Sequence, residues 1–170
     1  DKDTEDQLRW QRAKDLRELC RQYEALFLVN DRVDLALAVD ADGVHLGQQD
    51  LPIAVARQLL GLDKIIGRST TNPEEMAKAI AEGADYIGVG PVYATPTKAG
   101  KKPAGLDYVQ YAATNSPVPW FAIGGIDGSN LAEVMEAGAT QVAIVRAIME
   151  ATNPTQTTAQ LVTHLGGLIP

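Results

Sequence analysis

The chain has 170 residues, of which 45% are hydrophobic and 22% charged, which is enough for one folded domain with its own core. Its formal net charge of −7 argues against nucleic acid or an anionic membrane as the main partner, because both bind positively charged surfaces. No apolar run is long enough to span a bilayer, and no secretory signal opens the chain. The single cysteine, Cys20, excludes an internal disulfide, so we expect a cytoplasmic protein without nucleic-acid or membrane partners.

The predicted elements alternate between helices and short apolar strands. The first is an amphipathic helix from Thr4 to Tyr23, in which Thr4 and Gln7 have the spacing of a capping box. A strand is predicted from Leu26 to Val29. Further strands are predicted at Gly43 to Gly47, Ile65 to Ser69, Tyr86 to Gly90, Trp120 to Gly124 and Gln141 to Val145. Further helices are predicted at Val33 to Val39, Pro52 to Leu60, Pro73 to Glu82, Leu106 to Thr114, Asn130 to Ala137 and Thr155 to His164.

This repetition of strand and helix predicts a parallel sheet with right-handed crossovers. Three of the strands are entered in the same way, with a helix or short turn that ends near glycine before an apolar strand begins, at Ala41-Asp-Gly-Val44, Glu82-Gly-Ala-Asp-Tyr-Ile87 and Glu136-Ala-Gly-Ala-Thr-Gln-Val142. An open, doubly wound sheet is the competing fold, but no Gly-x-Gly-x-x-Gly fingerprint follows an early strand. We therefore predict an α/β fold, a TIM (β/α)8 barrel that lacks its first strand, helix and strand. Residues 1–170 would form a single, N-terminally incomplete barrel domain.

Polar and glycine residues follow all six predicted strands, and a parallel β/α protein gathers its chemistry at these strand ends. Asp31 follows the first strand directly, and Asp50 lies just past the second. Neighbouring strands lie about 4.8 Å apart, so the two carboxylates could share one Mg²⁺ together with substrate phosphate oxygens. The alternative is that each aspartate caps the helix that follows it.

Three later segments predict phosphate binding. The loop after Gly90 carries two hydroxyls and a lysine, Thr95, Thr97 and Lys98, although it could equally be a solvated connection. Gly125 would let backbone N–H groups approach an anion, or would only make a tight turn. Arg146 would bind phosphate or pair with a surface acid. His45 lies inside a strand, where a packed, hydrogen-bonded role is favoured over a catalytic one.

With these residues in view, the chain resembles the thiamine-phosphate synthase family, also called thiamine-phosphate pyrophosphorylase. The resemblance covers almost the whole chain and keeps the family's motif order and approximate spacing. The matching stretches are Phe27-Leu-Val-Asn-Asp-Arg32, Ala41-Asp-Gly-Val-His-Leu-Gly-Gln-Gln-Asp50, Gly67-Arg-Ser69, Gly83-Ala-Asp-Tyr-Ile-Gly-Val-Gly-Pro-Val-Tyr93, Thr95-Pro-Thr-Lys98 and Ala122-Ile-Gly-Gly-Ile126.

The resemblance implies a transferase that couples 4-amino-2-methyl-5-hydroxymethylpyrimidine diphosphate with a thiazole phosphate, carboxylated or not, to give thiamine phosphate and pyrophosphate. Carried over by motif, Asp31 and Asp50 are the Mg²⁺ ligands, and Lys98 and Ser69 are the catalytic residues. Asn30, Ser69 and Lys98 would contact the pyrimidine diphosphate. The thiazole phosphate would meet Thr95, Pro96, Thr97, Gly125, Val145 and Arg146. The protein would mainly position the substrates and neutralise charge, so no nucleophilic side chain is expected.

The chain departs from the family pattern at two places. A Gln-x-Arg-x-Lys motif that grips the diphosphate would fall just before Asp1, and Arg146 stands where the family often has serine. We therefore expect little activity from the isolated chain, with an upstream segment or a homo-oligomer completing the barrel. Two alternatives stay open: a thiazole tautomerase-like isomerase with the same barrel, and a non-catalytic fragment that only binds phosphate ligands.

Overall fold

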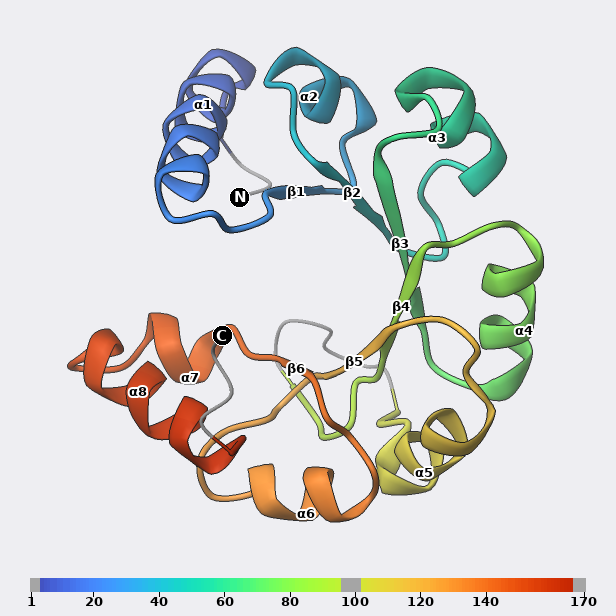
Figure 1. Cartoon of the computed structure of the whole chain (residues 1–170), viewed down its shortest axis with the longest axis vertical. Helices are drawn as coiled ribbons and strands as arrows, with labels where there is room; N and C mark the ends of the chain where they lie inside the picture. Colours follow the sequence, from blue (N-terminus) through green and yellow to red (C-terminus); the bar gives the residue numbers. More distant parts are fainter. Residues whose placement is uncertain (1–3, 96–101, 167–170) are drawn as a thin grey trace. The chain divides into compact units, whose positions relative to one another are not determined.

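A computed structural model describes residues 4–95 and 102–166, in which six parallel strands alternate with eight helices. The strands are β1 (Leu28–Asn30), β2 (Gly43–Leu46), β3 (Ile65–Thr70), β4 (Tyr86–Val89), β5 (Trp120–Ile123) and β6 (Val142–Ala143), and their order in the sheet follows the chain. The helices are α1 (Asp6–Gln22), α2 (Val33–Ala38), α3 (Ile53–Leu60), α4 (Pro73–Ala81), α5 (Gly105–Asn115), α6 (Leu131–Glu136), α7 (Arg146–Met149) and α8 (Pro154–His164). The predicted alternation of strand and helix is confirmed (Figure 1).

The chain divides into two compact units, which we call the first and the second unit. The first comprises Asp1–Ser69 and Ala79–Tyr86, and the second comprises Thr70–Lys78 and Ile87–Pro170. The prediction of a single domain over residues 1–170 stays a prediction.

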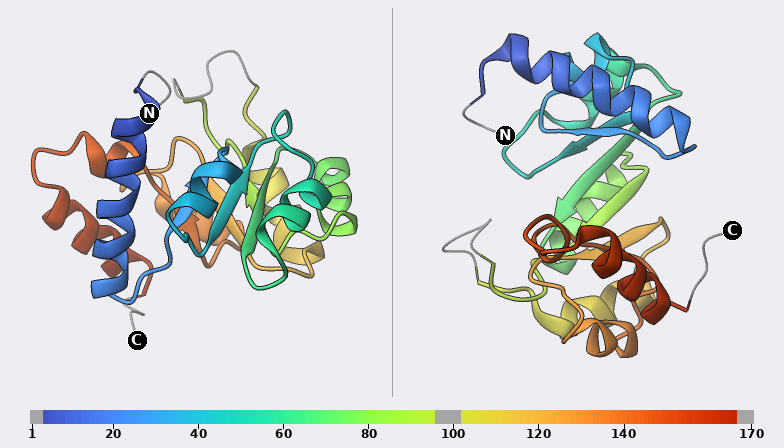
Figure 2. Two further views of the ribbon diagram at one scale, coloured as in Figure 1. Left: turned by 90° about the horizontal axis from the view of Figure 1, so that it is seen from above. Right: turned by 90° about the vertical axis from the view of Figure 1, so that its left-hand side faces the viewer.

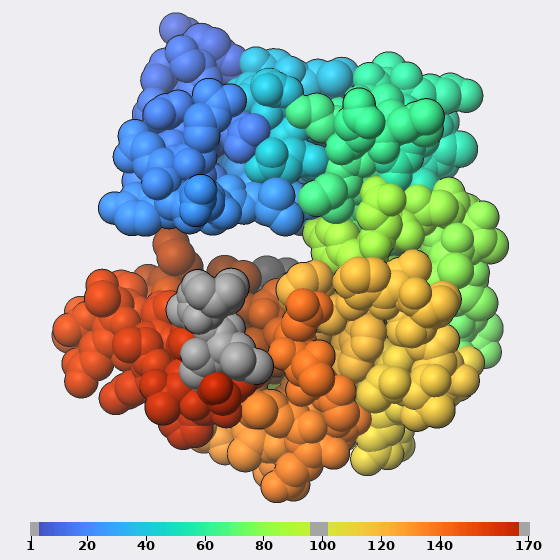
Figure 3. All heavy atoms as spheres, in the orientation of Figure 1, coloured from blue at the N-terminus to red at the C-terminus, as the bar shows by residue number. Residues whose placement is uncertain are grey.

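In the first unit, three helices cover one face of β1, β2 and β3. Figures 1 and 2 show α1, α2 and α3 on the same side of these strands, and in Figure 3 their atoms, blue to blue-green, lie side by side. The strands are in parallel register, with Asn30 opposite His45 and His45 opposite Gly67. The apolar side chains of Val44, Leu46 and Ile66 are fully buried, so the middle of this sheet is core.

The start of α1 differs from the prediction. The helix is capped by Glu5, without a side-chain hydrogen bond, so Gln7 does not occupy the third helical position that a capping box requires. Arg9 instead binds the Thr4 carbonyl, 2.7 Å from Nη2. The apolar stripe of α1 is only partly covered, because Leu8 and Leu16 are each about half exposed, at 48% and 49%.

Strands β1 and β6 depart most from their predicted bounds. Strand β1 begins at Leu28, and Leu26, predicted to be its first residue, is exposed. Strand β6 ends at Ala143, and the chain turns at once into the short helix α7, which was not predicted. Arg146 is therefore the first residue of a helix and does not end a strand.

The second unit packs α5, α6 and α8 with β4, β5 and β6 (Figure 1). Its core includes the fully buried Ile87, Ala122 and Val134. Thr70 is also buried, and its hydroxyl donates to the Gly88 carbonyl at 2.9 Å while it accepts from the Tyr108 phenol at 2.6 Å. Within the described ranges, no helix has both the length and the apolar character needed to cross a membrane.

Candidate active site

The carboxyl end of β1 carries Asn30 and Asp31 in a tight turn. The Asp31 backbone has a φ of 65°, in the left-handed region that Asp tolerates better than most side chains. Its N–H donates to the His45 carbonyl at 2.9 Å, and the Arg32 N–H returns to the Asn30 carbonyl at 2.8 Å. The alternative role of Asp31 as a helix cap is wrong, because α2 is capped by Arg32 without a side-chain hydrogen bond.

The carboxyl end of β2 leads into a turn that Asp50 closes. Its Oδ2 accepts from the Gly47 N–H at 2.6 Å, and its own N–H donates to the Gly47 carbonyl at 3.2 Å. Asp50 does not cap the next helix either, because α3 is capped by Pro52 without a side-chain bond. Among the described residues, Asp50 Oδ1 accepts no hydrogen bond, so this oxygen is available to a ligand.

These two aspartates suit a hard divalent cation. They follow neighbouring parallel strands, and carboxylate oxygens are what Mg²⁺ prefers. No group of three or more His, Cys, Asp or Glu residues in the described parts of the chain could hold a metal. Mg²⁺ does not need one, since it commonly takes one or two carboxylates and completes its shell with water and substrate phosphates. The donor set therefore fits Mg²⁺.

Ser69 lies near the end of β3, half-buried and hydrogen-bonded on both its side chain and its backbone. Its Oγ lies 2.8 Å from His45 Nε2, and its carbonyl accepts from Gln48 Nε2 at 2.7 Å. His45 Nδ1 lies 2.8 Å from the Tyr86 hydroxyl, so the predicted packed, hydrogen-bonded histidine is confirmed. Sequence reasoning missed Tyr86 as a neighbour of this site. Strand register alone could have indicated the pairing of β2 with β3.

A cavity of about 570 Å³ in the first unit opens beside the end of β1. Asn30 and Asp31 line it together with three guanidinium-bearing residues, Arg9, Arg12 and Arg32. Arg32 forms an ion pair with Asp34, which holds the pKa of that carboxyl at about 2. This cavity thus combines cationic side chains with the predicted metal ligand.

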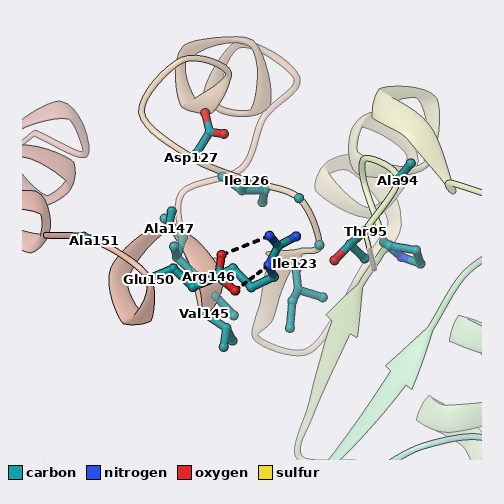
Figure 4. Close-up of a pocket in the computed structure, with 15 residues that line it drawn as sticks. Ala94, Thr95, Ile123, Ile126, Asp127, Val145, Arg146, Ala147, Glu150 and Ala151 are labelled. Carbon is teal, nitrogen blue, oxygen red and sulfur yellow. Dashed lines mark hydrogen bonds and ion pairs between the residues drawn. The ribbon is translucent and has the colours of Figure 1, made fainter. Parts of the chain in front are cut away.

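The second unit contains a cavity of about 470 Å³ at the ends of β5 and β6 (Figure 4). Thr95, Gly125, Val145 and Arg146, all predicted to bind the thiazole phosphate, line it. Its other lining residues are Pro91, Ala94, Ile123, Gly124, Ile126, Asp127, Ala143, Ile144, Ala147, Glu150 and Ala151. The predicted site residues Pro96, Thr97 and Lys98 lie outside the residues that the structure describes.

The turn after β5, Gly124 and Gly125, lines this cavity. Gly124 and Gly125 have φ values of 103° and 69°, which favour glycine. Asn130 fixes the turn, because its Nδ2 donates to the Gly125 carbonyl at 2.9 Å. The alternative that Gly125 makes a tight turn is therefore correct. The Gly125 N–H, however, has no hydrogen-bond partner in the described parts of the chain, which leaves it free to bind an anion.

Arg146 reaches into the cavity but is already paired. Figure 4 shows its guanidinium bound through two contacts to the Glu150 carboxylate, at 3.0 Å and 2.9 Å, with Thr95 on the opposite side. This hydrogen-bonded pair raises the pKa of Arg146 and lowers the pKa of Glu150. The alternative that Arg146 pairs with a surface acid is thus confirmed. The i,i+4 spacing of Glu150 could have identified the partner had α7 been predicted.

Comparison with known proteins identifies relatives along the whole chain. The family model described as thiamine monophosphate synthase matches residues 1–148. A thiamine-phosphate synthase from Synechocystis sp. is 92% identical over 170 residues, which is 100% of this chain and 50% of that protein. A thiamine-phosphate synthase from Nostoc sp. is 66% identical over 170 residues, 100% of this chain and 48% of that protein. The chain therefore spans about half the length of the curated relatives it matches.

A solved structure has the same fold. The thiamine phosphate pyrophosphorylase from Pyrococcus furiosus superposes with a TM-score of 0.91 at 38% identity, over 100% of this chain and 82% of that one. This likeness confirms the predicted α/β fold of the TIM-barrel type, with six strands among the described residues. Because the family model covers residues 1–148, the chain belongs to the thiamine monophosphate synthase family.

Proposed function

We propose that the chain carries the active site of a thiamine-phosphate synthase, which joins a pyrimidine diphosphate to a thiazole phosphate and releases pyrophosphate. The main support is that every motif-matched residue in the described ranges lies at one of two places. Asn30, Asp31, Asp50 and Ser69 lie at or just after the carboxyl ends of the strands of the first unit. Thr95, Gly125, Val145 and Arg146 all line the cavity of the second unit.

In this proposal the first unit binds the leaving group. Asp31 and Asp50 would hold Mg²⁺, which when bound neutralises charge on the departing pyrophosphate. The Asn30 amide and the Ser69 hydroxyl would donate to diphosphate oxygens. The family motif also assigns a positive charge at this ligand to Lys98, which lies outside the described residues. The bond between the methylene carbon and the bridging oxygen breaks, and pyrophosphate leaves with the electron pair.

The second unit would hold the nucleophile. The Gly125 N–H and the Thr95 hydroxyl are suited to bind the phosphate oxygens of the thiazole substrate. The lone pair of the thiazole nitrogen then forms the new bond to the methylene carbon. This nitrogen carries no proton, so formation of the bond requires no general base. A nucleophilic dyad or triad is likewise not expected from the sequence.

The test is a coupling assay on the 170-residue chain with both substrates and Mg²⁺, in which thiamine phosphate and pyrophosphate are quantified. We expect the two products in equal amounts, and their loss on chelation. Thermal melts with each substrate accompany this assay and report binding, because a bound ligand raises the melting temperature. Absence of both product and stabilisation would overturn the proposal.

The same assay separates the rival functions. An isomerase would convert the thiazole phosphate without any pyrimidine substrate, whereas a binding-only protein would be stabilised by ligands and form no product. A cytoplasmic location and self-association into a homo-oligomer, both expected from the sequence, stay predictions. Cell fractionation and light scattering of the purified chain are the respective checks.

A further inference from the structure

His45 connects two hydroxyl groups within the first unit. Its Nε2 lies 2.8 Å from Ser69 Oγ and its Nδ1 lies 2.8 Å from the Tyr86 hydroxyl, so both ring nitrogens have a polar neighbour. The three side chains come from three successive strands, β2, β3 and β4. Only Ser69 of the three matches a motif residue with a role in substrate binding.

The sequence is arranged locally to make this chain of contacts possible. His45 stands opposite Gly67 in the pairing of β2 with β3. A Cβ atom at Gly67 would overlap the ring of Tyr86, so the glycine leaves the space that this ring occupies. The Tyr86 ring then lies 5.5 Å from the His45 ring, centroid to centroid, with its hydroxyl at Nδ1. Glycine at position 67 is therefore required by the network itself.

We propose that His45 is a positioning residue, which orients the Ser69 hydroxyl toward the oxygens of the pyrimidine diphosphate, and that Tyr86 selects the tautomer of His45 that does so. This inference rests on the proposed function, because Ser69 is assigned to the diphosphate there. His45 itself would touch no substrate atom and would act through Ser69.

The positions of the protons on Tyr86, His45 and Ser69 decide what Ser69 can donate to a ligand. A neutral imidazole donates through one nitrogen and accepts through the other. Burial raises the pKa of Tyr86 to about 12, so its phenol stays protonated near neutral pH. A phenol is a stronger donor than an aliphatic hydroxyl, which favours donation from Tyr86 to Nδ1. The ring proton then lies on Nε2 and is donated to Ser69 Oγ.

This arrangement suits a diphosphate ligand. Diphosphate oxygens only accept hydrogen bonds, and the Ser69 hydroxyl has a single proton to give. If Nε2 donates to Ser69 Oγ, that proton stays available for the ligand. In the opposite tautomer Ser69 would donate to His45, and its lone pairs would face the phosphate oxygens. The Gln48 amide, bound to the Ser69 carbonyl at 2.7 Å, fixes the backbone from which the hydroxyl projects.

The binding test uses inorganic pyrophosphate with Mg²⁺ as the probe, titrated by calorimetry into the 170-residue chain. The variants are Ser69→Ala, His45→Phe and the double variant. We expect each single variant to weaken binding about 10-fold, which is typical for the loss of a hydrogen bond to a charged group. The double variant should bind no more weakly than Ser69→Ala, because His45 acts through Ser69. Independent losses that multiply, a parent-like His45→Phe, or a parent chain that does not bind pyrophosphate would each overturn the proposal.

Two further variants separate positioning from folding. His45→Gln keeps a side-chain donor that can reach Ser69, so we expect it to recover most of the pyrophosphate affinity. His164→Gln is the matched control, since His164 is exposed on α8 and its one hydrogen bond among the described residues is to the Gln160 carbonyl. Melting temperatures of all variants report whether they fold. Failure of His45→Gln, when folded, to exceed His45→Phe would contradict the proposal.

A spectroscopic measurement tests the tautomer without any substitution at His45. The chain has two histidines, so ¹⁵N NMR of the imidazoles is readily assigned with His164→Gln. We expect the proton of neutral His45 on Nε2, and a shift toward the other tautomer in Tyr86→Phe. A proton on Nδ1 in the parent chain would overturn the proposal, whatever the binding results are.

These outcomes are distinct from those that test the proposed function. Pyrophosphate binding needs no turnover, so a parent chain that binds it through the His45–Ser69 pair but makes no thiamine phosphate would refute only the synthase activity. A parent chain that is active but in which the two variants act independently would refute only the role of His45.

Discussion

At the scale of single residues, the turn at Asp31 combines an unusual backbone with a candidate metal ligand. Its φ of 65° is a conformation that Gly adopts freely, Asn and Asp tolerate, and Ala adopts at a cost of about 1 kcal/mol. Substitutions at this position therefore separate the backbone requirement from the carboxylate. Asp31→Gly and Asp31→Asn remove the charge but keep the turn, whereas Asp31→Ala loses both.

We expect the free energies of unfolding of Asp31→Gly and Asp31→Asn to lie within about 1 kcal/mol of that of the parent chain. Asp31→Ala should lose about 1–2 kcal/mol of unfolding free energy. All three should lose most of their Mn²⁺ affinity, with Mn²⁺ serving as a probe of the magnesium site. Urea unfolding and Mn²⁺ titration are the two measurements. Asp63→Asn, at an exposed loop carboxylate, is the control and should keep metal binding. Full Mn²⁺ affinity in Asp31→Gly would exclude Asp31 as a ligand.

A second prediction concerns the Arg146–Glu150 pair at the cavity of the second unit. Both side chains are exposed, and the carboxylate occupies the Nε–Nη2 edge of the guanidinium, an edge that can bind a phosphate through two hydrogen bonds. Glu150→Gln should therefore tighten binding of the thiazole phosphate about 2- to 5-fold, and Arg146→Ala should weaken it. Calorimetry with the thiazole phosphate at low and high salt measures both. Glu136→Gln, another exposed acid of this unit, should change nothing. Unchanged affinity for the thiazole phosphate in both site variants would exclude the Arg146 guanidinium as a phosphate ligand.

At the scale of elements, two aspartates join strand beginnings in the same way. Asp42, just before β2, accepts from the Phe27 N–H at 2.7 Å and donates its own N–H to the Phe27 carbonyl at 2.9 Å. Asp85, just before β4, exchanges the same two bonds with Ile66, at 2.7 Å and 2.8 Å. The repeated Ala-Asp in the sequence thus corresponds to a repeated structural link between neighbouring strands.

Each link is completed by an arginine, Arg17 at 3.0 Å from Asp42 and Arg57 at 2.6 Å from Asp85. Asp85→Asn keeps the size of the side chain but removes its charge, so we expect a loss of about 0.5–1.5 kcal/mol in the free energy of unfolding. Urea titration measures it, with Asp63→Asn as the matched control. A loss no larger than that of the control would show that the aspartate contributes little to the sheet.

The same elements show what the sequence could predict. Apolar periodicity placed all six strands, because buried parallel strands need continuous apolar runs. Local signals failed where tertiary contacts decide: Glu5 replaced Thr4 as the cap of α1, and α7 begins where a strand was expected to end. In the site, the motifs predicted Ser69 but not its link to Tyr86, because that link depends on strand register and on the space at Gly67.

At the scale of the whole molecule, each of the two units contains a hydrogen-bonded phenol that is at least half-buried. Tyr86, in the first unit, is bonded to His45, and Tyr108, in the second, is bonded to Thr70. Burial raises the pKa of both phenols to about 12. Because an unfolded tyrosine ionises near pH 10, both groups should make the folded chain less stable in alkali.

The unfolded chain loses its phenol protons at a lower pH than the folded chain does, so stability falls as the pH rises. Below about pH 10 both phenols are protonated in the folded and the unfolded chain, so their contribution to the free energy of unfolding is fully present. Between about pH 10 and 12 only the unfolded chain ionises, so stability should fall by on the order of 2 kcal/mol for each tyrosine. Tyr108→Phe should start about 1 kcal/mol less stable at pH 8, through loss of the bond to Thr70, yet fall less steeply. Urea titrations from pH 8 to 11 measure both effects, with Tyr23→Phe, at a side chain that is 77% exposed, expected to parallel the parent chain. Equal slopes for Tyr108→Phe and the parent chain would mean that the folded protein does not hold this phenol in its neutral form.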